Sequence, residues 1–348
     1  MSRRINVAAV QMDISPAPTD ERLACAGKLA SQAAQEGAQL VVLPELFNTG
    51  YGYSLENHDR VEPLSGPTVT WMKETAVRLD VHLAGALMLV DGKDIYNALL
   101  LFAPDGRMWR YDKSYPWAIE RGFFRGRKGT TVAQTDLGAF GMLICWDVGH
   151  LNLWKEYAGK VDMILISSCP ANVGNPTFHF PNGDELTFDD MGSFLAQSKE
   201  EGMKNPLFGT MINQQTAWMG VPAVNTVTCG KMRTKVANGR SFWAGCLPSA
   251  PSLVKYLPQA NHMEISTDVL QGSKVVDATG SVLAELKQEE GEGFAIAEVT
   301  LPDKRPVPAK PQPPSPLPRS AYLYSDVLWP LTSIPVYRKG VRRLSQGI

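Results

Sequence analysis

The segment 141–147, GMLICWD, ends an apolar run with a thiol, Cys145, and then turns polar at Asp147. A cysteine here is either a small buried apolar side chain or a nucleophile at the end of a strand, and free cysteine is among the residues most often buried. A nucleophilic thiol needs a group that accepts its proton and donors that hold the oxyanion formed by its attack. Cys145 is therefore a catalytic candidate only if the chain brings such groups to it.

Two further segments carry residues of the required types. Glu45, in LVVLPELFNTGY, ends an apolar run, where a carboxylate is either desolvated, with the raised pKa of a general base, or exposed at the strand end. Lys113, in WRYDKSYPWAIERG, is surrounded by aromatic residues. A nearby lysine lowers the pKa of a thiol, but lysines also lie along aromatic surfaces without a catalytic role. His150 follows Cys145 by five residues, a spacing that does not decide whether the two side chains meet.

Near-continuous apolar runs alternate with helical patterns along most of the chain, which predicts an α/β fold with covered sheets. Two turn dipeptides, in APDGRM (103–108) and DATGSV (277–282), join strand-like runs as hairpins, so we expect mixed rather than purely parallel sheets. The clearest predicted helices cover 20–36 and 66–79. The predicted strands lie at 5–12, 38–46, 81–90, 96–103, 141–147, 161–168, 221–228, 273–278 and 293–301.

In chain order, LPELFNTGY with Glu45, YDKSYPW with Lys113 and LICWD with Cys145 resemble the three motifs of the carbon–nitrogen hydrolase (nitrilase) superfamily. The segments INVAAVQMD, VDMILISS, VPAVN and SKVVDATGSVLAEL are also similar to that family, and the resemblance fades after about residue 301. It implies a four-layer αββα sandwich with two mixed β-sheets in a hydrolase domain over residues 1–301. Residues 302–348 are expected to form an extended Pro-rich C-terminal arm and tail.

The resemblance also implies roles for the motif residues. Glu45 is the general base, Lys113 stabilises the tetrahedral intermediate, and Cys145 forms the acyl-enzyme. Glu120, seven residues after Lys113, is similar to an additional glutamate of the family, which positions the lysine and the substrate amide; beside Arg121 it also fits an exposed surface acid. No cofactor or metal is required, and the cysteines and histidines show no metal-ligand spacing.

The motifs leave the substrate open. KSYPWAIERGFF is similar to a stretch of aliphatic amidases and formamidases, with one residue fewer between lysine and glutamate, and Cys-Trp-Asp stands where nitrilases commonly have Cys-Trp-Glu. A small-molecule amide, a nitrile and an N-carbamoyl amino acid are all candidates. The last would use Arg121, Arg125 or Arg127 to bind its carboxylate. The residues expected to line the pocket, and to favour an apolar acyl group, are Tyr51, Tyr115, Trp117, Trp146 and His150.

Composition excludes several other classes of function. The chain of 348 residues has a formal net charge of −1 and no long basic run, so we expect no nucleic-acid partner. The apolar run near the N-terminus is broken at Gln11 and Asp13, too short for a signal peptide, and no run is long enough for a membrane span. Five scattered cysteines without a CxxC pair indicate no disulfide framework, so the expected compartment is the reducing cytoplasm.

Two further segments have unusual composition. Residues 170–210 are a long connection, of the kind that often has a function such as a lid. Residues 302–320 hold eight prolines and should extend away from the body. The apolar tail is expected to pack on its own body or on another subunit of a homo-oligomer, with Pro330 and Pro335 interrupting any helix. A catalytically weak scaffold or binding subunit is the alternative from another class, and the intact Glu-Lys-Cys set counts against it.

Overall fold

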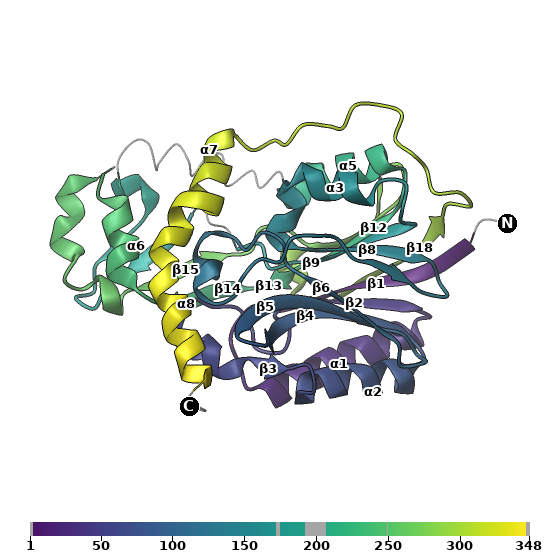
Figure 1. The fold of residues 1–348 in the computed structure, drawn as a ribbon, viewed down its shortest axis with the longest axis horizontal. Coiled ribbons are helices and arrows are strands. Elements are labelled where there is room, and N and C mark those ends of the chain that lie inside the picture. Colours follow the sequence, from purple (N-terminus) through teal and green to yellow (C-terminus); the bar gives the residue numbers. More distant parts are fainter. Residues whose placement is uncertain (1–2, 172–174, 192–206, 249, 346–348) are drawn as a thin grey trace.

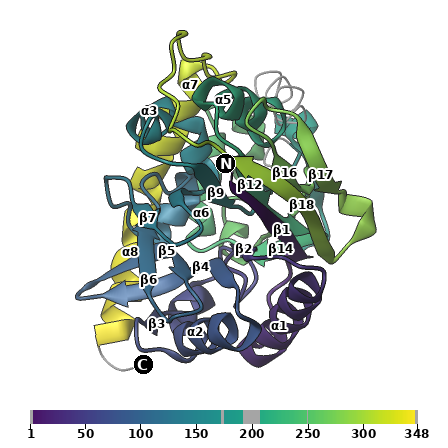
Figure 2. The same cartoon turned by 90° about the vertical axis from the view of Figure 1, so that its right-hand side faces the viewer.

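The computed structural model describes residues 3–171, 175–191, 207–248 and 250–345. Two large mixed sheets lie face to face, and helices cover the outer face of each (Figure 1 and Figure 2). The prediction of an α/β fold with a four-layer αββα core and mixed sheets is confirmed. α1 (Thr19–Gln35) and α2 (Pro67–Leu79) cover the first sheet, and α3 (Leu151–Tyr157) and α5 (Ile212–Met219) cover the second.

The first sheet has eight strands among the described residues, in the order β13-β1-β2-β4-β5-β6, with β18 paired to β1 and β3 to β4. β1, β2 and β4 are parallel, whereas β5 is antiparallel to both β4 and β6. β6 therefore runs in the same direction as β2 and ends at the same edge of the sheet. The strands are β1 (Arg3–Asp13), β2 (Leu40–Glu45), β3 (Glu62–Pro63), β4 (His82–Asp91), β5 (Asp94–Phe102), β6 (Met108–Asp112), β13 (Thr228–Cys229) and β18 (Gly293–Leu301).

The second sheet has six strands in the described part of the chain, in the order β17-β16-β12-β9-β8-β7. Its centre, β8, β9 and β12, is parallel, and both predicted hairpins are present, one as β5–β6 and the other as β16–β17. The strands are β7 (Val132–Gln134), β8 (Ala139–Ile144), β9 (Met163–Ser167), β12 (Ala223–Thr226), β16 (Ser273–Val276) and β17 (Val282–Leu286).

The side chains of β1 alternate between two cores. Ala8 and Val10 pack with the helices that cover the first sheet, and Val7 and Ala9 pack with the second sheet. Helix α1 turns one apolar stripe toward the same core, because its buried residues recur three and four positions apart. That stripe consists of Ala26, Leu29, Ala30 and Ala33.

A third sheet of four strands, in the order β11-β10-β15-β14, was not predicted. Its strands are short and only partly apolar, so they have a weak sequence signal. It includes part of the 170–210 connection, of which 172–174 and 192–206 lie outside the described residues, so the lid interpretation stays a prediction. The strands are β10 (Thr177–His179), β11 (Glu185–Leu186), β14 (Lys231–Lys235) and β15 (Glu264–Asp268), and α6 (Gly239–Cys246) packs beside them.

Short helical turns connect many of these elements. Two of them, η2 and η3, hold candidate site residues. The turns are η1 (Leu55–Arg60), η2 (Ala118–Gly122), η3 (Cys145–Gly149), η4 (Phe188–Met191), η5 (Leu207–Met211), η6 (Pro251–Tyr256), η7 (Ala260–His262), η8 (Gln288–Glu290) and η9 (Leu323–Leu328).

The Pro-rich segment 302–318 is extended, but it lies against the body instead of leaving it (Figure 1). Gln215 Nε2 and Trp218 Nε1 on α5 donate hydrogen bonds to the carbonyl oxygens of Pro313, at 3.0 Å, and Lys310, at 2.9 Å. A proline-rich chain forms no internal backbone hydrogen bonds, so its carbonyl oxygens are available to such donors. The domain boundary at residue 301 stays a prediction.

The chain ends in a long helical segment made of α7 (Arg319–Tyr322), η9 and α8 (Trp329–Ser345), which lies across one end of the sandwich (Figure 1). This helix continues through Pro335, so the expected interruption was wrong. Packing offsets the lost hydrogen bond, because α8 buries Val336 and Tyr337 and the Tyr337 hydroxyl donates to Asp94 Oδ1 at 2.8 Å. Within the described ranges, no helix is both long enough and apolar enough to cross a membrane.

Candidate active site

Glu45 is the last residue of β2, and its side chain is buried. Its Oε1 accepts hydrogen bonds from Lys113 Nζ at 2.8 Å and from Asn97 Nδ2 at 2.7 Å. Burial raises the pKa of Glu45 to about 7, against the opposing effects of Lys113 and Cys145. A carboxyl group with this pKa takes up and releases a proton near neutral pH, as a general base requires. Asn97, on β5, was not predicted.

Lys113 follows β6 directly and is completely buried. Its Nζ lies 2.8 Å from Glu45 Oε1 and 2.7 Å from Glu120 Oε2. Burial alone would lower the pKa of Lys113, but the Glu120 and Glu45 carboxylates raise it well above its ordinary value, so the ammonium stays charged. An ammonium has three N–H donors. The two ion pairs occupy two of them, which leaves a third N–H outside these pairs.

Cys145 follows β8 and begins η3, with a φ of 47° in the left-handed region. Five non-glycine residues of the described chain have a positive φ; besides Cys145 they include Leu46, next to Glu45, and Ala118, two residues before Glu120. Backbone strain of this kind is concentrated at functional sites, where the surrounding structure holds it. All three segments that carry the candidate residues thus contain a strained backbone position.

Burial and then the Glu45 carboxylate raise the pKa of the Cys145 thiol well above its ordinary value, and Lys113 lowers it only in part. Lys113 lowers this pKa, as expected from the sequence, but burial and the Glu45 carboxylate outweigh its effect. These effects favour the thiol over the thiolate at Cys145. A base must accept its proton during attack, and Glu45 adjoins it.

Glu120 is buried in η2, so its interpretation as an exposed surface acid is wrong. Its Oε2 accepts hydrogen bonds from Lys113 Nζ and from the Trp117 backbone N–H, both at 2.7 Å, and its Oε1 accepts one from the Tyr51 hydroxyl. Tyr51 and Trp117, both expected to line the pocket, therefore hold Glu120, the first through its side chain and the second through its backbone.

Asp147 joins η3, the cysteine turn of residues 145–149, to the loop after Lys113, a role that sequence analysis missed. Its side chain is fully buried. Oδ2 accepts from the Tyr111 hydroxyl at 2.8 Å and from the Ile144 N–H at 3.2 Å, and Oδ1 accepts from the Tyr115 N–H at 2.8 Å. A carboxylate in the apolar context of GMLICWD was the available signal, because a buried charge needs several partners.

The remaining predicted pocket residues form an aromatic group beside η3. The His150 ring stacks on Tyr115 with centroids 3.5 Å apart and meets Trp146 edge-on at 5.8 Å. Two residues of the C-terminal helical segment complete the group and were not predicted. The Tyr322 ring packs against both Trp146 and His150, and Asp326 accepts from Trp146 Nε1–H at 3.0 Å.

All three arginines considered for a substrate carboxylate lie near acids of this chain, with Arg121 Nη2 4.0 Å from Asp326 Oδ1. Arg125 Nε lies 2.5 Å from Asp94 Oδ1, and Arg127 Nη1 lies 2.7 Å from Asp112 Oδ2. Their charges are therefore compensated, and this geometry does not favour an N-carbamoyl amino acid over a neutral amide.

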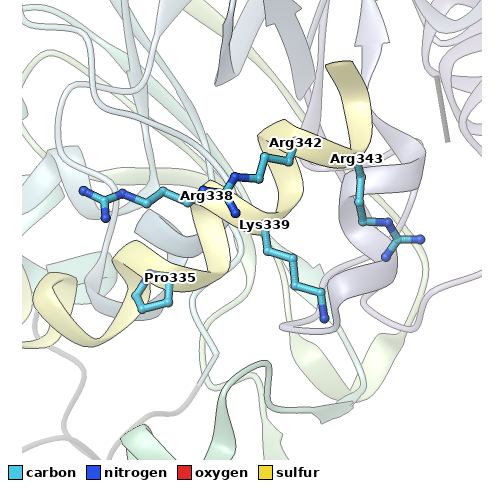
Figure 3. A pocket seen from close by; sticks show the side chains of 5 residues that line it. All are labelled: Pro335, Arg338, Lys339, Arg342 and Arg343. Atoms are coloured by element: carbon cyan, nitrogen blue, oxygen red, sulfur yellow. The ribbon is translucent and has the colours of Figure 1, made fainter. Parts of the chain in front are cut away.

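A surface hollow of about 570 Å³ lies along α8 and not at this cluster. Figure 3 shows the side chains that line it, and none of them contacts Glu45, Lys113 or Cys145 in the described structure. The lining residues are Pro335, Arg338, Lys339, Arg342 and Arg343.

Comparisons with known proteins agree with these features. Residues 6–309 match the model of the carbon-nitrogen hydrolase family. A nitrilase from Pyrococcus abyssi is 33% identical over 149 residues, which cover 41% of this chain and 56% of the relative. Omega-amidase NIT2 from Danio rerio is 29% identical over 174 residues, which cover 47% of this chain and 62% of the relative. The chain thus spans little more than half the length of these curated relatives.

Solved structures of similar fold cover more of the chain. An amidase from Nesterenkonia sp. has a TM-score of 0.60 at 18% identity, over 88% of this chain and 93% of the other. Nit3 from Saccharomyces cerevisiae, a nitrilase-superfamily member, has a TM-score of 0.59 at 20% identity, over 86% and 90% of the two chains. These likenesses show the shared fold. Because the family match includes the segments of Glu45, Lys113 and Cys145 and nearly the whole sandwich, this protein belongs to the carbon–nitrogen hydrolase family.

Proposed function

We propose that this protein hydrolyses carbon–nitrogen bonds of small-molecule amides, other than peptide bonds, through an acyl-enzyme on Cys145. The observation that carries the proposal is the buried cluster in which Lys113 bridges Glu45 and Glu120 beside the strained turn of Cys145. Burying three ionisable groups is unfavourable unless they are paired, and clusters with shifted pKa values are concentrated at active sites. The cluster supports a catalytic rather than a purely structural role.

In the first half-reaction, Cys145 Sγ attacks the amide carbon and its proton passes to Glu45. The carbonyl oxygen becomes an oxyanion, held by the third N–H of Lys113 and by the backbone N–H of Trp146, which lies in the first turn of η3 and has no acceptor within that turn. The oxyanion then collapses and the C–N bond breaks. Glu45 returns the proton to the leaving nitrogen, so ammonia or an amine departs and a thioester remains.

In the second half-reaction, water attacks the thioester while Glu45 accepts one of its protons. The second tetrahedral intermediate occupies the same oxyanion site. When the C–S bond breaks, the departing sulfur takes the proton from Glu45, and the carboxylic acid is released. Amide and water become acid and ammonia or amine, and each step is a proton transfer or an acyl transfer that the residues present can perform without a metal or cofactor.

The aromatic group beside η3 supports an amide with an apolar or flat acyl group. Tyr115, Trp146 and His150 form this group, Trp146 directly follows Cys145, and aromatic faces bind apolar groups well. A nitrile is the second candidate, because relatives of this chain include a nitrilase as well as omega-amidases. An N-carbamoyl amino acid is the third, on the same catalytic residues.

The test is ammonia release from a panel of amides, nitriles and N-carbamoyl compounds, with Cys145→Ala as the matched control. We expect turnover of apolar amides, an acyl adduct on Cys145 in intact-protein mass spectra of a slow substrate, and no effect of EDTA. A folded protein that alkylates at Cys145 but releases ammonia from no member of the panel would contradict the proposed activity and favour the scaffold alternative.

We also propose that the protein forms homo-oligomers in the cytoplasm. A row of apolar side chains follows the outer face of the C-terminal helical segment, each more than 40% exposed, and such patches often mark interfaces. The five cysteines are free, as suits a reducing compartment. The exposed row consists of Leu323, Val327, Leu331 and Ile334.

A further inference from the structure

Asp326 brings a carboxylate from the C-terminal helical segment to the cysteine turn. It lies beyond residue 309, where the family match ends, and it is the one acidic residue in the sequence from 304 to 348. It belongs to η9, a π-helical stretch between α7 and α8. π-Helical turns are rare in proteins overall, but those that occur are often found at functional sites. The segment that carries it crosses the end of the sandwich (Figure 1).

One oxygen of the Asp326 carboxylate contacts the cysteine turn, and the other contacts His150, the residue that follows the turn. Oδ1 accepts a hydrogen bond from Trp146 Nε1–H at 3.0 Å, and Oδ2 lies 3.0 Å from His150 Nε2. His150 Nδ1 in turn lies 3.2 Å from the carbonyl oxygen of Trp146, which closes a ring of three contacts. Trp146 is buried and directly follows Cys145. The carboxylate therefore holds the residue next to the nucleophile.

The same segment has two further contacts with the site. The Tyr322 hydroxyl donates to the carbonyl oxygen of Gly149, the last residue of η3, at 2.7 Å. Arg121 Nη2 lies 4.0 Å from Asp326 Oδ1, and Arg121 directly follows Glu120. The C-terminal segment thus contacts both ends of the cysteine turn and the neighbour of the glutamate that holds Lys113.

We propose that Asp326 is a positioning residue, which holds the Trp146 indole and thereby fixes Cys145 Sγ and the Trp146 N–H relative to the substrate carbonyl. The inference rests on the proposed function. η3 has five residues and begins with a strained φ, so its own hydrogen bonds hold it weakly. Without Asp326 the buried indole N–H has no acceptor, which favours a shifted Trp146. A displacement of about 1 Å at reacting groups costs about 10²-fold in rate.

The experiment compares Asp326→Ala, Asp326→Asn and Trp146→Phe with the double variant Asp326→Ala/Trp146→Phe. Asp303→Asn is the matched control, because Asp303 is an exposed acid in the Pro-rich segment that precedes the C-terminal helical segment. The measurements are kcat and KM for the best amide of the panel and the rate of Cys145 alkylation by iodoacetamide, which needs no substrate. Thermal unfolding checks that each variant is folded.

We expect Asp326→Ala to lower kcat about 10- to 100-fold with a smaller change in KM, and to lower the alkylation rate. Asp326→Asn should retain more activity, because its amide oxygen still accepts from the indole N–H. The double variant should be no slower than the slower single variant, since both changes remove the same hydrogen bond. Asp303→Asn should match the wild type.

Wild-type kcat and alkylation in a folded Asp326→Ala protein would overturn the inference, as would losses that multiply in the double variant. If Asp326→Ala does not fold, Asp326→Asn and Trp146→Phe support the same comparison. Absence of amide turnover in the wild type would contradict the proposed function alone, because the alkylation rates still report whether Asp326 positions Cys145.

Discussion

Lys113 Nζ lies 2.7 Å from Glu120 Oε2, and both side chains are buried. Because Glu45 binds the same ammonium from the other side through Oε1, Lys113 is held between two carboxylates. Oε2 of Glu45 has no hydrogen-bond partner among the described residues. In the proposed mechanism Glu120 fixes the lysine, and this second oxygen of Glu45 accepts the proton of Cys145 or of water.

Replacing Glu120 with glutamine should lower kcat about 10²- to 10³-fold, because the oxyanion donor then loses one of its two charged supports. The protein should still fold, at a reduced melting temperature, since Lys113 keeps Glu45 as a partner in the buried site. Steady-state kinetics and thermal unfolding check both points. Glu298→Gln, at an exposed ion pair with Arg4, is the matched control. A wild-type kcat in Glu120→Gln would show that Glu120 is not needed for catalysis and would reduce the proposed site to Glu45, Lys113 and Cys145.

Cys145→Ala should abolish ammonia release and leave the melting temperature nearly unchanged, because it removes only a single sulfur atom. In the wild type, inactivation by iodoacetamide should follow modification of Cys145 as measured by peptide mass spectrometry. Cys25→Ser is the matched control, since Cys25 is the most exposed of the five thiols. Inactivation that follows another cysteine, with Cys145 unmodified, would refute the nucleophile assignment.

The pH profile of kcat/KM should rise through about pH 7, because Glu45 acts as a base only when deprotonated and burial raises its pKa to about 7. Asn97→Ala should shift this rise to higher pH. Asn97 Nδ2 donates to Glu45 Oε1, which favours the charged carboxylate, so its removal raises the pKa further. Rates measured from pH 5 to 9 show whether kcat/KM rises with pH and in which direction Asn97→Ala shifts that rise. A kcat/KM that falls with pH across neutrality would exclude Glu45 as the base.

The double variant Leu331→Asp/Ile334→Asp should reduce the sedimentation coefficient, because two charges on the exposed apolar row disfavour its burial between subunits. Val254→Asp, at a side chain 55% exposed on η6, is the control for a surface charge elsewhere. None of these substitutions removes a contact of Asp326. Activity per folded chain therefore shows, independently of sedimentation, whether the active site is intact. Identical sedimentation of all three proteins would show that this row is not the interface.

Local patterns in the sequence predicted an α/β fold with mixed sheets, and the resemblance of the motif segments to the family implied the sandwich. Apolar runs located most strands of the two large sheets, turn dipeptides located two hairpins, and the motif segments singled out Glu45, Lys113 and Cys145. These signals are local, because strand periodicity and turn chemistry depend on neighbouring residues. The third sheet escaped prediction since its strands have two to five residues and lack a continuous apolar run.

The tertiary structure alone decided what surrounds those three residues. Tyr51 reaches Glu120 across 69 positions of sequence, and Asp326 reaches Trp146 across 180. The apolar context of Asp147 indicated a buried carboxylate but not that its partners include the loop after Lys113, and the helix through Pro335 depends on packing of its buried face. Tyrosine, aspartate and proline are common on surfaces and in turns, so the residue type alone does not predict these partners or the continued helix. Their roles arise because burial leaves each polar group only the partners that the fold places beside it.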